Sequence, residues 1–309
     1  MSPRAAAPSL SCTVGRVRLA APVLLASGTC GYGLELAGHV DFPALGGVVL
    51  KSLTQEPRAG NPMPRVAECS QGMLNAIGLA NVGVEAFCRE KWPKVKALPC
   101  AVLANVAGAS QAEYVAVARR LDRLDGLAGL ELNVSCPNVS HGGMEFGREP
   151  RVLERLVAAV RKATKRPLWV KLTPNVADIA PLARAAEAAG ADAITVINTL
   201  RGLRMDLKQQ RPVLGNVTGG LSGPAIMPVA LFHVYRAAGA VKIPVVGCGG
   251  IETAEDALEF ILAGASAVQV GTATFRRPRA AELIAAGLRR QLQARGLRSL
   301  KPLIGAGRI

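Results

Sequence analysis

The chain has 309 residues, half of them hydrophobic, and its 37 lysines and arginines against 22 aspartates and glutamates give a formal net charge of +15. The length suits one parallel α/β barrel with insertions, so we expect a single domain over residues 1–309 with a flexible N-terminus over about residues 1–10. Behind the N-terminus there is no apolar run of the ~18 residues that a membrane helix needs. We therefore expect a cytoplasmic protein with no membrane association.

The basic residues and the cysteines exclude several classes of partner. The arginines are spread along helical segments with few aromatic residues between them, which favours solvated helix faces over a nucleic-acid surface. The seven cysteines are odd in number, scattered, and never spaced as C-x-x-C. This spacing argues against a disulfide framework, a zinc site, or an iron–sulfur cluster held by this chain alone. We expect no metal site.

Apolar runs of strand length alternate with amphipathic helical patterns along the chain. Near-continuous hydrophobic runs are typical of strands that are buried on both faces. The predicted strands are Val23–Ser27, Gly47–Leu53, Ala101–Val106, Leu130–Val134, Leu168–Leu172, Ala193–Asn198, Ile243–Gly247 and Ala267–Gly271. The predicted helices are Gln111–Leu124, Arg151–Ala163, Ile179–Ala189, Pro224–Ala238, Ala254–Leu262 and Ala280–Arg295. This alternation predicts an α/β fold, a (β/α)₈ TIM barrel.

Four segments do not fit minimal barrel connections. Ser11–Ala20 precedes the first strand and is predicted to be a hairpin that seals the bottom of the barrel. Thr54–Trp92 and Leu200–Ser222 are long insertions after the second and sixth strands, and Asn138–Gly147 is a candidate mobile lid. Because long loops after barrel strands lie on the catalytic face, we expect the last three segments there.

Polar residues fall where six of the predicted strands end, and in a barrel these ends meet at one rim. They are Ser27, Lys51, Asn105, Asn133 with Cys136, Lys171, and Asn198 with Thr199. The seventh and eighth strands instead end in Gly247-Cys248-Gly249-Gly250 and Val270-Gly271-Thr272. Glycines after the last two strands of a barrel are typical of a phosphate site. The sequence therefore predicts an active site that binds a phosphorylated group, without a dinucleotide-binding glycine motif.

Four motifs carry a family resemblance. The segments NVSCPN (133–138), NAIGL (75–79), KLTPN (171–175) and GGLSGP (219–224) resemble dihydroorotate dehydrogenase, in the family's order, over roughly Val17 to Ala285. The cysteine in the first motif resembles the soluble class 1 enzymes, whereas class 2 enzymes carry serine and an N-terminal extension. The stretches Gly72–Leu79 and Asn216–Ala225 look like subclass 1B.

The resemblance implies an FMN-dependent oxidation of (S)-dihydroorotate to orotate in de novo pyrimidine (UMP) biosynthesis. Cys136 is then the general base at C5, with hydride transfer from C6 to flavin N5, and Lys171 stabilises charge near flavin N1 and C2=O. The implied substrate contacts are Lys51, Asn75, Ala76, Ile77, Gly78, Leu79, Asn133, Asn198 and Thr199. The implied FMN contacts are Ser27, Lys51, Ser52, Asn105, Asn133, Lys171, Ile197, Gly223, Gly249, Gly250, Gly271 and Thr272.

The electrons must then leave the flavin, and the sequence shows no acceptor site of its own. In subclass 1B the acceptor is NAD⁺, reached through a second subunit that carries FAD and a [2Fe–2S] cluster. The resemblance therefore implies a homodimer that assembles into a heterotetramer with that subunit.

Four alternatives stay open on the sequence. The first is a class 1A-like enzyme that uses fumarate, and the second is an FMN barrel acting on other pyrimidines, similar to dihydropyrimidine dehydrogenase. The third is a Schiff-base aldolase with Lys171 as its nucleophile. The fourth is a non-catalytic flavin-binding barrel.

Overall fold

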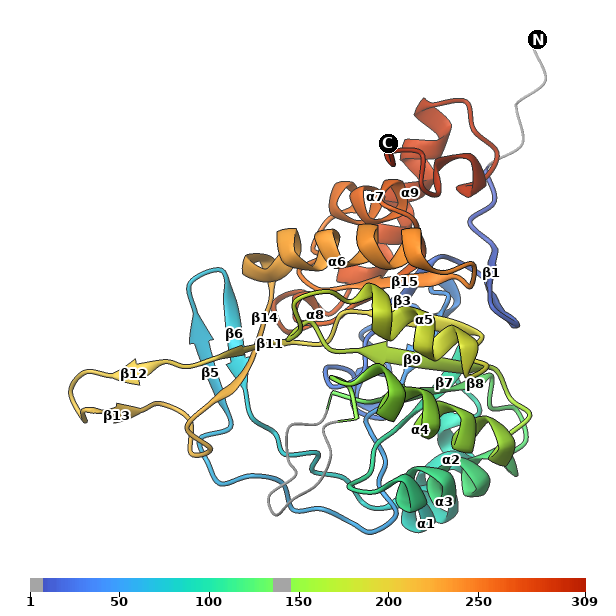
Figure 1. The fold of residues 1–309 in the computed structure, drawn as a ribbon. Helices are drawn as coiled ribbons and strands as arrows, with labels where there is room; N and C mark the ends of the chain where they lie inside the picture. Colours follow the sequence, from blue (N-terminus) through green and yellow to red (C-terminus); the bar gives the residue numbers. More distant parts are fainter. Residues whose placement is uncertain (1–7, 136–145) are drawn as a thin grey trace.

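Eight parallel strands close into a barrel at the centre of the computed structural model, which describes residues 8–135 and 146–309 (Figure 1). Around the barrel the strands follow the order β10-β15-β16-β3-β4-β7-β8-β9. Their bounds are β3 Val23–Leu25, β4 Gly47–Val49, β7 Ala101–Val106, β8 Gly129–Asn133, β9 Leu168–Leu172, β10 Ala193–Val196, β15 Val245–Cys248 and β16 Ala265–Val270. The predicted (β/α)₈ barrel is confirmed.

Helices surround the barrel, each packed against the next. The longer ones are α3 (Gln111–Asp122), α4 (Pro150–Ala163), α5 (Ala180–Ala188), α6 (Met227–Ala240), α7 (Ala254–Leu262) and α9 (Ala280–Ala294). Side chains at their N-termini set some of these starts. The Ser110 hydroxyl accepts from the Glu113 N–H before α3, and Thr253 and Asp256 form a reciprocal capping box before α7. Short helical turns are η1 (Leu34–Leu36), η2 (Phe42–Ala44), η4 (Pro224–Ile226), α8 (Ala273–Arg276) and η5 (Lys301–Leu303).

A hairpin of β1 (Cys12–Val14) and β2 (Val17–Leu19) closes the bottom of the barrel, as the sequence predicted. Its apolar side chains Val14, Val17 and Leu19 pack on the lowest inward-facing layer of the strands, in which Trp169 is fully buried. At this end the Ser9 N–H donates to the Arg298 carbonyl and Leu10 is buried. The pocket must therefore open at the opposite end of the barrel.

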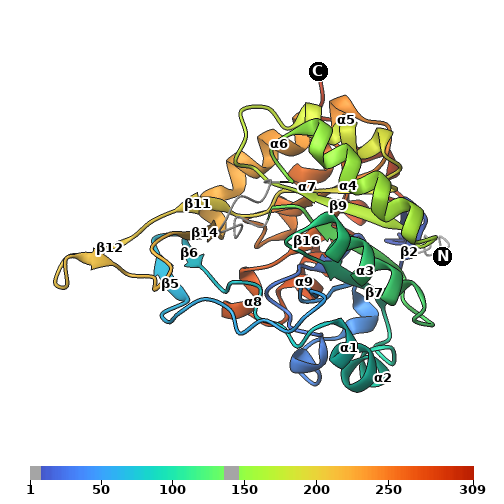
Figure 2. The ribbon, with the colours of Figure 1, turned by 60° about the horizontal axis from the view of Figure 1, so that its bottom comes forward.

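The two long insertions pair with each other at the carboxyl ends of the strands. The hairpin of β5 (Val66–Cys69) and β6 (Gly72–Asn75) comes from the first, and β11 (Leu200–Gly202) and β14 (Gly219–Ser222) come from the second. They form one antiparallel sheet in the order β11-β14-β6-β5. The hairpin of β12 (Met205–Asp206) and β13 (Arg211–Pro212) extends this sheet away from the barrel in both ribbon views (Figures 1 and 2). We call these six strands the arm.

The structure corrects several predicted boundaries. Three strands end earlier than predicted, before Ser27, Leu53 and Asn198, and β15 begins after the predicted start at Ile243. The first insertion also contains a helical segment that the sequence analysis missed, made of α1 (Val84–Ala86), a π-helical turn (Phe87–Lys91) and α2 (Trp92–Val95). The π turn and the proline at position 93 break the 3.6-residue pattern that marks a regular helix. Of the predicted lid, residues 138–145 lie outside the described residues.

Within the described residues, no helix is both long enough and apolar enough to span a bilayer.

The bottom layer should contribute strongly to stability. We expect Trp169→Ala to lower the free energy of unfolding by about 3–5 kcal/mol, because it leaves a cavity beneath the hairpin. Leu207→Ala is the matched control, since Leu207 is 88% exposed on the arm, and it should change stability by less than about 0.5 kcal/mol. Urea unfolding of both variants measures the difference, and equal effects would contradict the packing described above.

Candidate functional site

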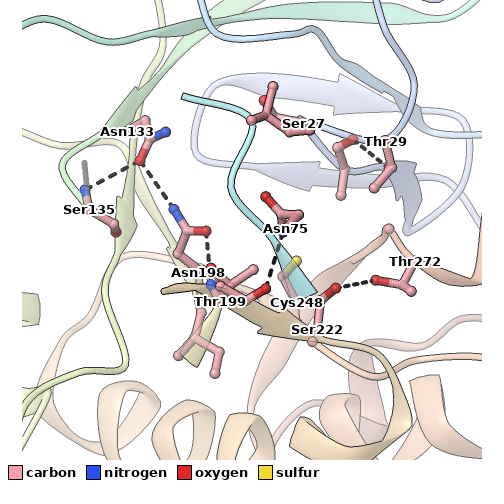
Figure 3. A pocket seen from close by; sticks show the side chains of 18 of the residues that line it. Ser27, Thr29, Asn75, Asn133, Ser135, Asn198, Thr199, Ser222, Cys248 and Thr272 are labelled. Atoms are coloured by element: carbon pink, nitrogen blue, oxygen red, sulfur yellow. Dashed lines mark hydrogen bonds between the residues drawn. The ribbon is translucent and has the colours of Figure 1, made fainter. Parts of the chain in front are cut away.

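A pocket of about 420 Å³ opens at the carboxyl ends of the barrel strands, beneath the arm (Figure 3). This volume is within the range of roughly 300–1,000 Å³ that is usual for small-molecule sites. Every predicted site residue that the structure describes lines it. They are Ser27, Lys51, Ser52, Asn75, Ala76, Ile77, Gly78, Leu79, Asn105, Asn133, Lys171, Ile197, Asn198, Thr199, Gly223, Gly249, Gly250, Gly271 and Thr272.

Cys136 lies outside the described residues, so the structure says nothing of its placement. The described part of its motif does reach the pocket. Ser135 lines the pocket, and its backbone N–H donates to Asn133 Oδ1 at 3.3 Å.

Lys171 is buried on β9, with its Nζ 3.5 Å from Gln269 Oε1 and 3.9 Å from Cys248 Sγ. Burial alone would lower the pKa of its ammonium group, but attraction to Cys248, Glu131 and Cys30 outweighs burial and raises the pKa. Burial also raises the pKa of both thiols, that of Cys30 to about 12.

Lys51 follows β4 and differs electrostatically from Lys171. Its side chain is only partly buried, and burial lowers its pKa. Attraction to Glu35 opposes this shift, while repulsion from Arg65 adds to it. Lys51 is thus the lysine of the pocket that loses its proton more readily than an ordinary lysine.

Amide side chains form a linked row across the pocket floor (Figure 3). Asn198 Nδ2 donates to Asn133 Oδ1 at 3.1 Å, and the Thr199 N–H donates to Asn198 Oδ1 at 2.8 Å. From the arm, Asn75 Nδ2 donates to the Gly220 carbonyl at 3.3 Å. Because each amide carries both a donor and an acceptor, this row suits a planar ligand with alternating N–H and C=O groups.

Glycines form the end of the pocket at β15, β16 and the start of α6. Gly223, Gly249 and Gly250 have φ values of +100°, +129° and +78°, which favour glycine. A Cβ at Gly250 would lie 2.6 Å from the Met227 Cβ and 2.9 Å from the Met227 backbone nitrogen. Beside them, the hydroxyls of Thr272 and Ser222 are 2.8 Å apart. Bare backbone and hydroxyl groups at this place fit a phosphate group, since they supply donors without side-chain bulk.

Other pocket residues were not singled out from the sequence as site residues. They include Thr29, Asn61, Arg148, Thr173, Asn175, Arg201, Thr218, Ser222 and Cys248. Asn175 is the clearest case, because its Nδ2 donates to the Thr199 carbonyl at 3.2 Å and its Oδ1 accepts from the Arg201 N–H at 2.9 Å. Its position in the KLTPN motif was the one available signal.

A parallel barrel with an amide-lined pocket and a glycine-lined end at its last two strands defines a TIM-barrel protein with a candidate site for a phosphorylated group. The family model described as dihydroorotate dehydrogenase matches residues 9–292, and the chain belongs to that family.

Relatives resemble the chain over almost its whole length. A protein of Trichlorobacter lovleyi is 54% identical over 299 residues, which are 97% of this chain and 98% of the relative. Proteins of Geotalea uraniireducens and Geobacter sulfurreducens are 52% and 51% identical with the same coverage. All three are named dihydroorotate dehydrogenase B (NAD(+)), catalytic subunit.

The glycine-lined end should not tolerate side chains. We expect Gly250→Ala to destabilise the protein more than Gly126→Ala, although the two glycines have nearly equal φ values of +78° and +80°. Alanine at Gly126 meets no atom within 4 Å, so it suffers only backbone strain of about 1–2 kcal/mol. Alanine at Gly250 adds the overlap with Met227. Thermal unfolding measures both, and similar losses would show that the backbone conformation alone requires glycine.

Proposed function

We propose that this chain catalyses the FMN-dependent oxidation of (S)-dihydroorotate to orotate in pyrimidine biosynthesis, as the catalytic subunit of an NAD⁺-linked enzyme. The observation that carries the proposal is the pocket itself, in which two lysines and a row of amides meet a glycine-lined end. The family membership and the names of the full-length relatives support the same reaction.

The residues fit FMN in a consistent direction along the pocket. The residues that would hold its phosphate are Gly249, Gly250, Gly271 and Thr272, because they line that end of the pocket with backbone groups and a hydroxyl and without large side chains. Lys171 would lie at the isoalloxazine ring, where an ammonium group stabilises negative charge. When bound, FMN supplies the hydride-accepting centre of the reaction. Ser27, Ser52, Asn105, Asn133, Ile197 and Gly223 would complete the contacts.

Dihydroorotate is an anionic ring that carries amide groups, and the other half of the pocket offers matching groups. Lys51 would pair with its carboxylate, while Asn75, Asn133 and Asn198 would bind the ring amides. Backbone and side chains of Ala76, Ile77, Gly78, Leu79 and Thr199 would enclose it. Cys136, placed two residues after the pocket residue Val134, would remove the proton from C5.

The charge of Lys171 disfavours the aldolase alternative. A Schiff-base nucleophile needs a neutral amine, which calls for a lowered pKa, whereas the surroundings of Lys171 raise its pKa.

We further propose that the electrons pass to NAD⁺ through a partner subunit with FAD and a [2Fe–2S] cluster, in a heterotetramer built on a homodimer of this chain. The relatives' names, which specify NAD(+) and a catalytic subunit, support this assembly. We place the reaction in the cytoplasm, because the six described cysteines are free thiols, as a reducing compartment favours.

An anaerobic visible spectrum of the purified chain tests the function. Dihydroorotate should bleach the flavin absorbance, and NAD⁺ alone should not restore it until the partner subunit is added. Bleaching by dihydrouracil would instead favour the broader pyrimidine oxidoreductase. Rapid reoxidation by fumarate, with none by NAD⁺ and the partner, would favour the fumarate-linked enzyme, and a flavin that dihydroorotate never bleaches would overturn the proposal.

Cys136→Ser should retain FMN but reduce it with dihydroorotate about 10²–10⁴ times more slowly near neutral pH, since an alcohol is a far weaker acid than a thiol. Stopped-flow absorbance measures the rate. Cys69→Ser is the control for thiol loss, because Cys69 ends β5 and does not line the pocket. If Cys136→Ser reduced its flavin at the wild-type rate, Cys136 would not be the base.

A further inference from the structure

Three polar side chains lie inside the barrel beneath the pocket, and the proposed function gives them no role. Glu131 on β8, Thr195 on β10 and Gln269 on β16 are each 0–1% exposed, and none of them lines the pocket. A carboxylate buried this deeply is costly unless it is hydrogen-bonded and faces a positive charge. Its presence among apolar strand residues calls for a physical reason.

Glu131 accepts three hydrogen bonds from three different strands. Asn105 Nδ2 donates to its Oε1 at 2.8 Å, while Thr195 Oγ1 and Gln269 Nε2 donate to its Oε2 at 2.7 and 2.6 Å. An ionised carboxylate can only accept, so both amides must turn their NH₂ groups toward it. Their carbonyl oxygens then face away from Glu131, toward the pocket side of the cluster.

The first consequence falls on Lys171. Because Gln269 Nε2 faces Glu131, Gln269 Oε1 is the atom left to face Lys171 Nζ, at 3.5 Å. The ammonium group thereby gains an acceptor in addition to the charge of Glu131. The titratable groups around it are Glu131, Cys248 and Cys30, which contribute from β8, β15 and the loop after β3.

The second consequence is that the hydrogen bonds along the pocket floor all take the same direction. Asn105 Oδ1 accepts from the Ser52 hydroxyl, and Ser52 Oγ in turn accepts from Asn133 Nδ2 at 3.5 Å. Asn133 Oδ1 accepts from Asn198 Nδ2 at 3.1 Å. Every link in this row donates toward Glu131.

The hydrogen bonds at the end of the row farthest from Glu131 have the same donor-to-acceptor direction. Backbone N–H groups can only donate, and those of Ser135 and Thr199 do so to Asn133 Oδ1 and Asn198 Oδ1. The row therefore runs from backbone donors to a carboxylate acceptor, and no amide in it can flip without losing a bond. Each NH₂ group uses one hydrogen in the row and keeps a second one for other acceptors.

We propose that Glu131 is a positioning residue. Its buried carboxylate sets the donor-to-acceptor direction of the two chains of hydrogen bonds described above, one through Gln269 to Lys171 and one through Asn105 to the pocket asparagines, and so fixes Lys171 and the asparagines in their binding orientation. The proposal rests on the proposed function, in which Lys171 faces the flavin and the asparagines face the substrate. Glu131 itself touches neither, since it lies below the pocket floor.

Glu131→Gln tests the proposal, because it keeps the shape of the side chain but replaces an acceptor oxygen with a donor. Gln269 is then free to turn its NH₂ group toward Lys171, and the pKa of Lys171 falls as the attraction of the carboxylate is lost. We expect the midpoint potential of the bound flavin to become more negative. We also expect flavin reduction by dihydroorotate to slow by up to about a hundredfold. As pH rises, the variant should lose this activity at a lower pH than the wild type.

The sign of the potential shift separates positioning from simple charge removal. Loss of a nearby negative charge, with Lys171 unchanged, would favour the reduced anionic flavin and move the potential to more positive values. A positive shift, or an unchanged potential and pH profile, would overturn the proposal.

Two further variants serve as control and rescue. Thr195→Val removes one donor to Glu131 without breaking either chain, so it should lower stability yet keep the wild-type potential and rate. The double variant Glu131→Gln, Gln269→Glu moves the carboxylate next to Lys171 and restores the donor order, so its potential should return toward the wild-type value. Failure of this rescue, or a Thr195→Val variant that behaves like Glu131→Gln, would reduce Glu131 to a packing role.

If Glu131→Gln does not fold, Gln269→Leu retains the carboxylate and breaks the Lys171 branch alone. It should lower the potential while leaving the KM for dihydroorotate within about threefold of the wild type, and an unchanged potential would contradict the proposal. A wild-type chain that holds no FMN, or whose flavin dihydroorotate never bleaches, would instead refute the proposed function, before any variant is compared.

Discussion

Closure of eight parallel strands into one barrel is the constraint on which the rest of the structure depends. In-register pairs such as Asn133 with Lys171 bring residues that are far apart in the chain to the same height in the barrel. Because all strands point the same way, their carboxyl ends meet at one rim, and the polar residues at those ends must converge. The site is thus a consequence of the strand register, and the loops only complete it.

Along its axis the barrel changes from apolar to polar. The lowest layer contains Trp169 and is sealed by the β1–β2 hairpin. The next contains Glu131, Thr195 and Gln269, which are buried but hydrogen-bonded to one another. A buried polar layer is tolerable only when its members are satisfied, and the same requirement leaves it one arrangement. The apolar layer gives stability, while the polar layer gives the pocket its orientation.

The sequence predicted the barrel and its rim well, because both depend on local patterns. Apolar runs marked the strands, and single polar residues such as Lys51 and Asn105 marked their ends. The arm could not be predicted in this way, since its central pairing joins Asn75 to Gly220 across 145 positions. Glu131 and Gln269 were passed over for a different reason. Each is one polar residue inside an apolar run, and periodicity cannot tell an inward-facing polar side chain from a solvent-facing one. The placement of Cys136 stays a prediction.

The two lysines of the pocket differ in pKa because burial and neighbouring charged groups act on them to different extents. Lys171 is buried, yet attraction to Cys248, Glu131 and Cys30 raises its pKa, so the group stays charged at physiological pH. Lys51 is more exposed, yet burial lowers its pKa because Glu35 offsets the penalty only in part. As pH rises, Lys51 therefore loses its proton first, while Lys171 stays charged. In the proposed function, the carboxylate-binding charge is thus the pH-sensitive one, and the charge facing the flavin is protected. The difference arises from the groups that surround Lys171 inside the barrel, which are Cys248, Glu131 and Cys30.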